Sequence, residues 1–318
     1  MASTEDLSTE PRRGSLLRRV GIGLGMLVAV VLAYFVGGAL WVHKIDDDPA
    51  FDAQVIVPQG ASVTVAVVAD LVSREVDQHG WVANDPPFQP GYLLDNMPNY
   101  QTGIMTAVGR FATELRDRLA RVRGSSASDA DLERAAGKLN FPGDQWALQA
   151  SWPFVQAASE GQYRQGVEDL RHYNERLAQG QAVFERRADN LQAVLDRIAD
   201  DLGASSAALT HQVDRNATIF LDLQADDLFY RVKGRLYAYY LILRSFEQDF
   251  ANVIKERNLQ ASWDELLESA RLGASLHPWM VSNGPLDSQA VPNHLAAQGF
   301  LLLRVRTKLE EIVDILQT

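Results

Sequence analysis

The amino-acid sequence predicts an all-α protein, with a single N-terminal transmembrane helix followed by an exported helical bundle of long, heptad-patterned helices. Three observations favour this fold class. Residues 20–42 are apolar and uncharged, and apolar side chains further on recur at steps of three and four over long stretches. Segments that carry Pro, Gly and Trp separate those stretches.

Residues 20–42 have the length and composition of a membrane anchor. They are 23 residues without a charge, and twelve of them are Leu, Ile, Val or Phe. At about 1.5 Å per residue they span roughly 35 Å, enough for a hydrocarbon core of about 30 Å. Arginines at 12, 13, 18 and 19 precede the segment and aspartates at 46, 47 and 48 follow it, which predicts a cytoplasmic N-terminus.

The alternative for this segment is a cleaved signal peptide, because residues 37–39 are small. The apolar run exceeds the usual length of about 7–15 residues, which favours a retained anchor. The chain then divides into a cytoplasmic tail (1–19), the anchor (20–42), a linker (43–61) and a periplasmic helical domain (62–318).

Composition limits the function of the exported part. The chain carries a formal net charge of −11 and contains no Cys. A negatively charged surface repels phosphate groups, so nucleic acid is excluded as a partner. Without Cys, neither disulfides nor thiolate metal sites can form.

Each predicted helix of the domain has its own apolar periodicity. Ser62 is the expected N-cap of the first, in which valines recur at 65, 68, 72 and 76. A second helix is expected over residues 100–123 and a weaker one over 129–140. A shorter helix is predicted over 263–276, and the last contains Leu302, Val305, Leu309, Ile312 and Leu316.

A seven-residue repeat indicates a long helix, or two helices in register, in the middle of the chain. Its members are Tyr163, Leu170, Leu177, Phe184, Leu191 and Ile198. Gly180 lies where the companion positions are weak, and glycine costs about 1 kcal/mol relative to Ala inside a helix. We therefore expect a kink or a break at Gly180.

The most regular helix follows, with steps of three and four that are typical of a knobs-into-holes interface. Its apolar residues are Phe229, Val232, Leu236, Tyr239, Leu243, Phe246, Phe250 and Val253. Asp226 and Asp227 open it where the helix dipole favours negative charge. These long helices are predicted to share one bundle core, crossing at about 20°.

Two irregular segments, residues 81–98 and 279–292, are candidate binding loops. They carry Trp, Tyr and Phe together with Pro, which prevents a regular element. One interpretation is a ligand or partner pocket formed by both loops; the other is that their aromatics pack over the bundle. The candidate residues are Trp81, Tyr92, Asp95, Asn96, Trp279 and Asn283.

No catalytic constellation is present in the sequence. No two of the six histidines have the i, i+4 spacing of paired zinc ligands, and His211 with Asp214 is better explained as a solvent-exposed pair. Nucleophile-elbow, phosphate-loop and dinucleotide motifs are absent from the sequence. The sequence thus predicts no catalytic residue, no metal ligand and no cofactor.

Small residues form a stripe along the anchor at every fourth position: Gly21, Gly25, Ala29, Ala33 and Gly37. Such a stripe lets two helix backbones approach closely, so one hypothesis is that the anchor self-associates. The alternative is that Gly and Ala are simply frequent in membrane helices.

Four segments resemble one bacterial family. LLDNMPN at 93–99, SEGQYRQG at 159–166, RRADNL at 186–191 and DDLFYRVKG at 226–234 are similar to the family catalogued as domain of unknown function 2333. The resemblance extends over essentially the whole chain beyond the anchor. It implies a single-pass protein of Gram-negative bacteria, and it supplies no activity for particular residues.

Together these features predict an inner-membrane protein with a structural or protein-interaction role in the cell envelope. Its expected partners are the lipid bilayer around residues 20–42 and an envelope protein or a second copy of the chain. The alternative is a periplasmic sensor of a small ligand or cell-wall fragment. An envelope hydrolase would require a cleft with facing carboxylates.

Overall fold

A computed structural model describes residues 12–121, 128–148, 152–215, 222–286, 288–289 and 291–317. Within these ranges every regular element is helical, and only two isolated β-bridges occur, Leu148 with Val155 and Asn283 with Asn293. The predicted all-α class is confirmed. Most of the predicted tail, residues 1–11, lies outside the described part of the chain.

The long elements are α1 (Arg12–Val42), α2 (Val63–Ser73), α3 (Asn96–Glu114), α4 (Ala130–Leu139), α5 (Ser159–Ala178), α6 (Ala188–Arg215), α7 (Leu223–Asp249), α9 (Gln260–Ala274) and α10 (His294–Gln317). The short ones are the π-helical turns η1 (Arg74–Gln78) and η3 (Leu115–Leu119), the 3-10 helix η2 (Pro90–Leu93) and α8 (Ala251–Glu256).

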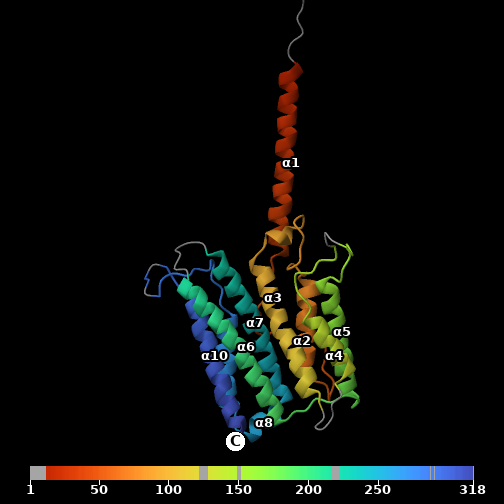
Figure 1. Ribbon diagram of the computed structural model, residues 1–318, viewed down its shortest axis with the longest axis vertical. Helices are drawn as coiled ribbons and strands as arrows, with labels where there is room; N and C mark the ends of the chain where they lie inside the picture. The colour runs from red at the N-terminus through yellow and green to blue at the C-terminus, as the bar shows by residue number, and fades with distance from the viewer. Residues whose placement is uncertain are drawn as a thin grey trace, which may run out of the picture.

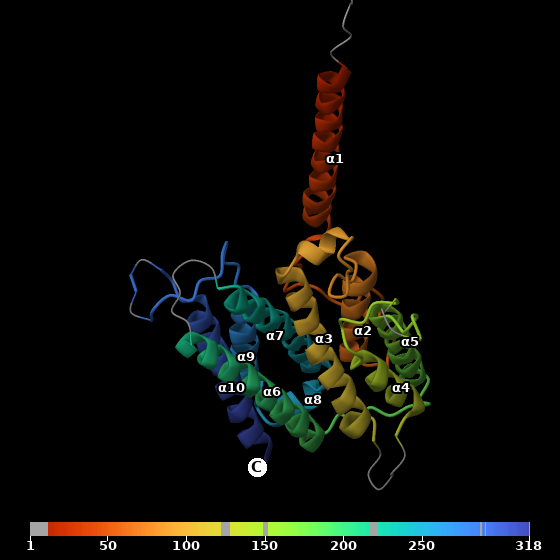
Figure 2. The same ribbon diagram turned by 45° about the horizontal axis from the view of Figure 1, so that its top comes forward.

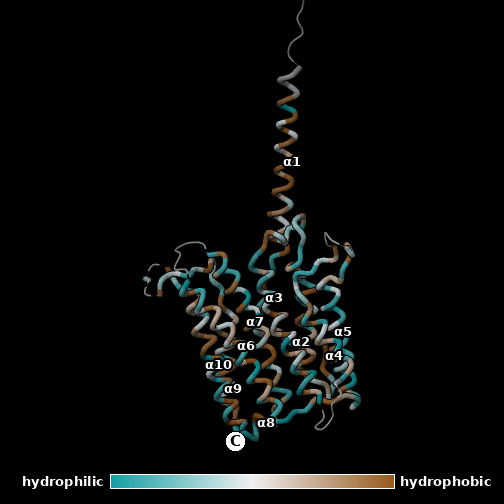
Figure 3. Tube along the Cα trace, in the orientation of Figure 1, coloured by the Kyte–Doolittle hydropathy of each residue, from teal (hydrophilic) through white to brown (hydrophobic). Residues whose placement is uncertain are grey.

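Helix α1 projects from one end of the bundle and is apolar over most of its length (Figures 1 and 3). Its segment Leu17–Val42 is long and apolar enough to cross a membrane, and it is not buried in the protein. The helix is longer at its N-terminal side than the predicted 20–42, because residues 12–19 continue it.

The bundle consists of two groups of helices that meet where α3 packs on α7. On one side, α4 packs on α3, α5 packs on α4 and α2, and α2 also packs on α7. On the other side, α9 and α6 pack on α7, and α10 packs on α6 and α9 (Figures 1 and 2). A continuous apolar core runs through both groups and includes Trp263, Tyr163 and Phe246. The described residues from Ser62 onward therefore form one packed body.

The contact between α3 and α7 requires two glycines. A Cβ atom on Gly103 of α3 would overlap the carbonyl oxygen of Arg231, and a Cβ on Gly234 of α7 would overlap that of Tyr100. The two backbones are in direct contact at this crossing, where no side chain fits between them.

The heptad repeat in the middle of the chain is divided between two helices. Helix α5 ends at Ala178, Gly180 adopts a left-handed φ of 69°, and α6 begins at Ala188. The expected break at Gly180 is confirmed. All six repeat residues are buried, with Phe184 in the connection that follows the break.

Three predicted boundaries differ from the structure. Helix α7 ends at Asp249, and Val253 belongs to α8, because Phe250 leaves the helical conformation. Helix α3 begins at Asn96, capped by Asp95, so Pro98 lies in its first turn, where a missing N–H costs nothing. The predicted end of this helix at residue 123 is too late, because helical structure ends with η3 at Leu119 and residues 120 and 121 are no longer helical. Ser62 caps α2 as expected, accepting from the Val65 N–H.

Candidate functional site

The linker, residues 43–61, lies along α7 and is packed into the bundle. Four polar-tipped side chains of α7 at steps of four, three and four face it: Lys233, Tyr237, Tyr240 and Arg244. We call them the α7 stripe. Residues at this spacing share one helix face, so a chain segment lying along that face can contact all four.

Each member of the α7 stripe binds a successive residue of the linker. Lys233 Nζ donates to Asp47 Oδ2 at 2.5 Å, and Tyr237 Oη donates to the Asp48 carbonyl at 2.9 Å. Tyr240 Oη donates to the Pro49 carbonyl at 3.2 Å. The Arg244 guanidinium donates to the carbonyls of Pro49 and Phe51. The linker therefore runs along α7 in the same direction, with a turn at residues 49–50 in which the Phe51 N–H donates to the Asp48 carbonyl at 3.2 Å.

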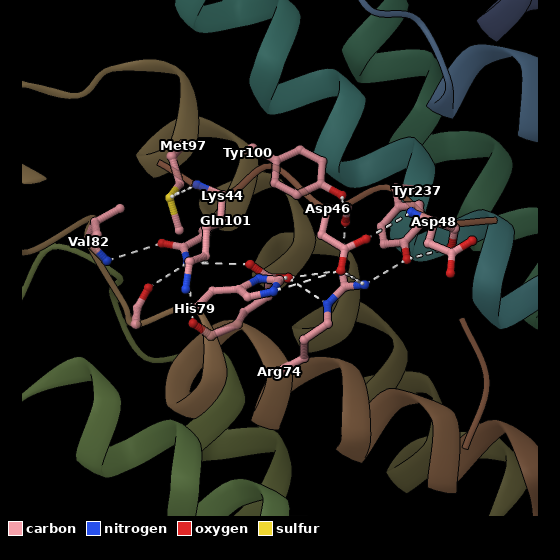
Figure 4. A network of polar contacts seen from close by, with 12 residues as sticks. Lys44, Asp46, Asp48, Arg74, His79, Val82, Met97, Tyr100, Gln101 and Tyr237 are labelled. Carbon is pink, nitrogen blue, oxygen red and sulfur yellow. Dashed lines mark hydrogen bonds and ion pairs between the residues drawn. The ribbon is translucent and has the colours of Figure 1, made fainter. Parts of the chain in front are cut away.

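A second group of contacts holds the linker where it leaves α1 (Figure 4). The Asp46 carbonyl accepts from Arg74 Nη2 at 2.8 Å and from Tyr100 Oη at 2.7 Å, and its carboxylate lies 3.3 Å from Arg74 Nη1. Arg74 is 3 % exposed and also pairs with the fully buried Glu75 at 2.9 Å. We call Asp46–Phe51, Arg74, Glu75 and the α7 stripe together the joint.

Arg74 is the central charge of the joint. Burial by itself would lower the pKa of Arg74. The charges of Glu75 and Asp46 and the neighbouring tyrosines outweigh burial, so the net pKa lies above its usual value. Its guanidinium also lies over the rings of Phe51, at 4.6 Å, and Tyr237, at 5.3 Å. Arg74 is thus a permanent buried cation that needs its carboxylate partners.

Lys233 is the second buried cation, with no exposed side-chain area. Burial lowers its pKa, whereas the hydrogen bond and charge of Asp47 act in the opposite direction. Lys233 Nζ also donates to the Leu276 carbonyl at 2.6 Å, and His277 Nε2 lies 2.9 Å from Asp47. Through Asp47, the linker is connected to the end of α9 as well as to α7.

The far end of the linker is fixed by Asp249, the last residue of α7. Its carboxylate accepts from the Ser62 hydroxyl at 2.6 Å and from the N–H groups of Val63 and Thr64. Arg186 Nη2 donates to the Ala61 carbonyl at 2.9 Å. The linker is therefore held at its far end and along Asp46–Phe51, which restricts its freedom as a tether.

The chemistry of the joint is structural. Arg74 is paired with Asp46 and Glu75, and Lys233 with Asp47. Figure 4 shows Arg74 and Tyr237 directed at the linker. Among the described residues no group of three or more His, Asp or Glu is placed to hold a metal ion. The joint can transmit orientation between α1 and the bundle, because each end of it is part of a packed element.

Sequence reasoning did not find the joint. Two features of the sequence could have indicated it. One is the α7 stripe, where Lys, Tyr and Arg recur at helical spacing, and the other is the run of three aspartates after the apolar segment. The aspartates were interpreted only as the outer flank of an anchor. Their carboxylates and carbonyls reach α7 only because the linker folds back onto the bundle.

The structure does not bring the six predicted loop residues together. Trp81 is buried, donates to the Gly143 carbonyl and packs edge-on against Tyr163 with ring centroids 5.0 Å apart. Trp279 is 99 % exposed, whereas Asn283 is buried and donates to the Gln212 carbonyl. Tyr92 is exposed beside α1. The predicted pocket between the two loops is therefore not formed by these side chains.

Asp95 and Asn96 do belong to a polar cluster, with two carboxylates from the start of α7. The Asn96 amide, oriented to satisfy its hydrogen bonds, donates to both Asp95 and Asp226. Asp227 accepts from Asn99 Nδ2 at 2.7 Å. Burial, Asp95 and Asp227 together raise the pKa of Asp226 to about 6, although the helix dipole favours a charge there.

We expect Asp226→Asn to stabilise the protein at pH 7.5 by roughly 1 kcal/mol, a value discounted for partial exposure. Folding raises the pKa of Asp226 from 3.8 to about 6. The carboxylate therefore destabilises the folded protein as the pH rises from the unfolded pKa to the folded pKa, and the full destabilisation is present above about pH 6. The gain should therefore disappear at pH 4. Denaturant unfolding at both pH values measures it.

Asp196→Asn is the matched control, because Asp196 is an exposed carboxylate on α6. It should change the free energy of unfolding little at either pH. An equal gain for Asp226→Asn at pH 4 and pH 7.5 would contradict the electrostatic explanation.

A cleft of about 420 Å³ lies between α3 and α6 and is lined by charged side chains. Asp201 accepts from Tyr239 Oη at 2.8 Å and lies 3.6 Å from Arg235 Nε. Glu114 pairs with Arg118 at 2.9 Å and with Arg197 at 3.6 Å. The cleft is large enough for a small ligand.

A general acid needs a raised pKa, and Asp117 in this cleft has the opposite. The hydrogen bond from Arg116 lowers the pKa of Asp117 in the same cleft. Paired carboxylates of this kind are suited to binding a charged group. His211 and Asp214, considered above as a metal pair, are both exposed on α6.

The small-residue stripe of α1 faces open space at three of its glycines. A Cβ atom on Gly21, Gly25 or Gly37 would contact nothing. At the neighbouring Gly38 a Cβ would overlap the ring of Pro90, so α1 touches the bundle on a different side. The stripe is accessible to another helix.

One long apolar helix, joined to an all-α bundle by a segment that is packed into the bundle, defines the class of this protein. The chain belongs to the bacterial family described as "uncharacterized protein conserved in bacteria", domain of unknown function 2333, whose model matches residues 19–225. The resemblance found in the sequence is confirmed. The match includes the apolar helix and ends before the segment at 226–234, so it contains Arg74 and the linker but not the α7 stripe. No curated protein and no solved structure matches the chain.

Proposed function

We propose that this chain is a single-pass protein of the bacterial inner membrane, with a cytoplasmic N-terminus and a periplasmic bundle, and that its role is structural or protein-interacting. The joint is the observation that carries the proposal. A catalytic domain that searches for substrate gains nothing from a fixed orientation. A protein that presents a surface to a partner at a set height and angle above a membrane requires one.

A second feature supports interaction with a protein. The core is continuous, and α10 exposes two large apolar side chains one turn apart, Phe300 at 62 % and Leu303 at 52 %. Apolar side chains left in water at one place on a helix favour burial against another protein.

The proposed topology predicts the labelling pattern of introduced cysteines, which is simple to interpret because the chain has none of its own. With a membrane-impermeant maleimide on spheroplasts, Glu256→Cys should be labelled at once and Ser3→Cys only after lysis. The reverse pattern, or loss of Ser3→Cys from the mature protein by cleavage, would contradict a retained N-in anchor.

Photocrosslinking in native membranes tests the interaction role. A photoreactive amino acid in place of Phe300 or Leu303 should give a discrete adduct with one protein or with a second copy of the chain. Glu168, exposed on α5 at the other side of the bundle, is the control and should give none. Equal absence of adducts at all three positions would remove the proposal that α10 meets a partner.

Binding of a small ligand is the second candidate function, favoured by the α3–α6 cleft. A rise in melting temperature with soluble cell-wall fragments, present in the unaltered chain and absent in Asp201→Asn, would distinguish it from a purely structural role.

A further inference from the structure

The large apolar side chains that the bundle exposes are concentrated at the end from which α1 projects. They lie on the α2–α3, α4–α5 and α9–α10 connections, all at that end (Figures 1 and 2). The residues are Phe88, Tyr92, Leu93, Leu148, Trp152, Phe154, Val155, Trp279, Met280 and Leu286. We call them the apical side chains.

The opposite end of the bundle is different. Its connections at residues 179–187 and 250–259 are fully described, and neither contributes an exposed large apolar side chain. Outside the apical side chains, the other exposed examples beyond α1 in the described residues are Val55 and Ile56 on the linker, Leu223 at the start of α7, and Phe300 and Leu303 on α10. Val55 and Ile56 lie toward the opposite end, because the linker contacts Arg244 just before them and Asp249, the last residue of α7, just after them. Apart from these two side chains, the asymmetry follows the position of α1.

The α2–α3 connection reaches alongside α1 itself. Tyr34 Oη donates to the Phe88 carbonyl at 3.2 Å, and Pro90 lies against Gly38. Tyr34 lies eight residues before Val42, the last residue of α1. This separation is about 12 Å along the helix axis. Phe88 therefore lies beside the part of α1 that is apolar enough to be in a membrane.

The composition of the apical side chains matches the interfacial region of a bilayer. Trp and Tyr are enriched where headgroups meet acyl chains, because their rings are apolar and their polar atoms stay hydrated. Trp279 is 99 % exposed and Trp152 is 83 % exposed, with Phe154 as the aromatic contact of Trp152 at 5.9 Å. In water alone, most of the apolar surface of both indole rings stays in contact with solvent, which is unfavourable.

We propose that the apical side chains insert into the headgroup region of the outer leaflet of the same bilayer that α1 crosses, so that the bundle rests on the membrane. This inference rests on the proposed function, because it requires that α1 is a membrane anchor. The joint explains why lipid, and not a protein, covers these side chains. Because Asp46 and Asp47 are held by Arg74 and Lys233, the linker has no slack that would admit a protein between bundle and bilayer.

Spin labels on single introduced cysteines test this in the full chain, reconstituted in vesicles of phosphatidylethanolamine and phosphatidylglycerol. The apical labels replace Phe88, Trp152 and Trp279. Ile56→Cys is the matched control, since Ile56 is apolar and 95 % exposed but lies on the linker. Val30→Cys reports on α1. Accessibility of each label to oxygen and to a water-soluble nickel chelate is measured by power saturation.

We expect the three apical labels to be several-fold less accessible to the nickel chelate than the label at residue 56, while they remain accessible to oxygen. Apical labels as accessible to nickel as residue 56, with residue 30 protected, would overturn the insertion and leave the anchor intact. Loss of protection at residue 30 would overturn the anchor and this inference together. Protection of the apical labels from both reagents would mean that protein covers them, which also overturns it.

Discussion

Replacing Arg74 with methionine is expected to lower the free energy of unfolding by about 3–5 kcal/mol, because it leaves a buried carboxylate without its cation. Glu75 has no exposed area, and neither the hydrogen bond from Gln101 Nε2, at 3.3 Å, nor His79 Nδ1, at 3.4 Å, replaces the permanently charged guanidinium. The Asp46 carbonyl loses a donor in the same step. Urea denaturation of the detergent-solubilised full chain, followed by circular dichroism, measures the change.

Two further variants separate the buried charge from the shape of the side chain. Arg74→Met combined with Glu75→Gln removes both charges and should recover a large part of the loss. Arg164→Met, at a pair with Asp77 that is about half exposed, should cost about 0–1 kcal/mol. Equal costs at Arg74 and Arg164 would mean that the joint contributes no more than a surface ion pair.

Gly234→Ala is expected to destabilise the protein by about 3 kcal/mol, through the α3–α7 crossing. The new Cβ would overlap the Tyr100 carbonyl oxygen, and this obstacle is backbone inside a helix, which cannot rotate away. Relief requires the two helices to separate, and α7 is also the helix that binds the linker. The same denaturation measurement applies, and Gly103→Ala should behave alike.

Gly137→Ala is the control for the glycine substitution. Gly137 lies inside α4, and a Cβ there would contact nothing. Alanine should therefore stabilise the protein by roughly 0.5–1 kcal/mol through helix propensity. A gain at Gly234 similar to that at Gly137 would show that the helices have room at the crossing.

The two expected losses concern one physical property, the fixed position of the bundle relative to α1. The α3–α7 crossing places the α7 stripe, and the α7 stripe with Arg74 places the linker. If the joint is loosened while the bundle stays folded, the orientation of the bundle relative to α1 becomes variable. The milder variant Tyr240→Phe, which removes one hydrogen bond to Pro49, is suited to that comparison.

Periodicity made the helices predictable. The steps of three and four in α7 and α10, the Ser62 cap and the break at Gly180 are local properties, set by which side chains share a face and by the φ that glycine tolerates. The loop residues were less predictable. Burial of Trp81 and exposure of Trp279 depend on which neighbouring element covers each ring.

By itself the sequence determined the helical class, the apolar N-terminal helix and its charged flanks, because composition and helical spacing act within a few turns of chain. Only the tertiary structure decided that the linker is part of the bundle. Its contacts join residues nearly two hundred positions apart, such as Asp47 and Lys233, and no local pattern specifies such a pair. Folding brings the aspartates that follow the apolar helix onto buried cations, and this makes a predicted tether into a rigid joint.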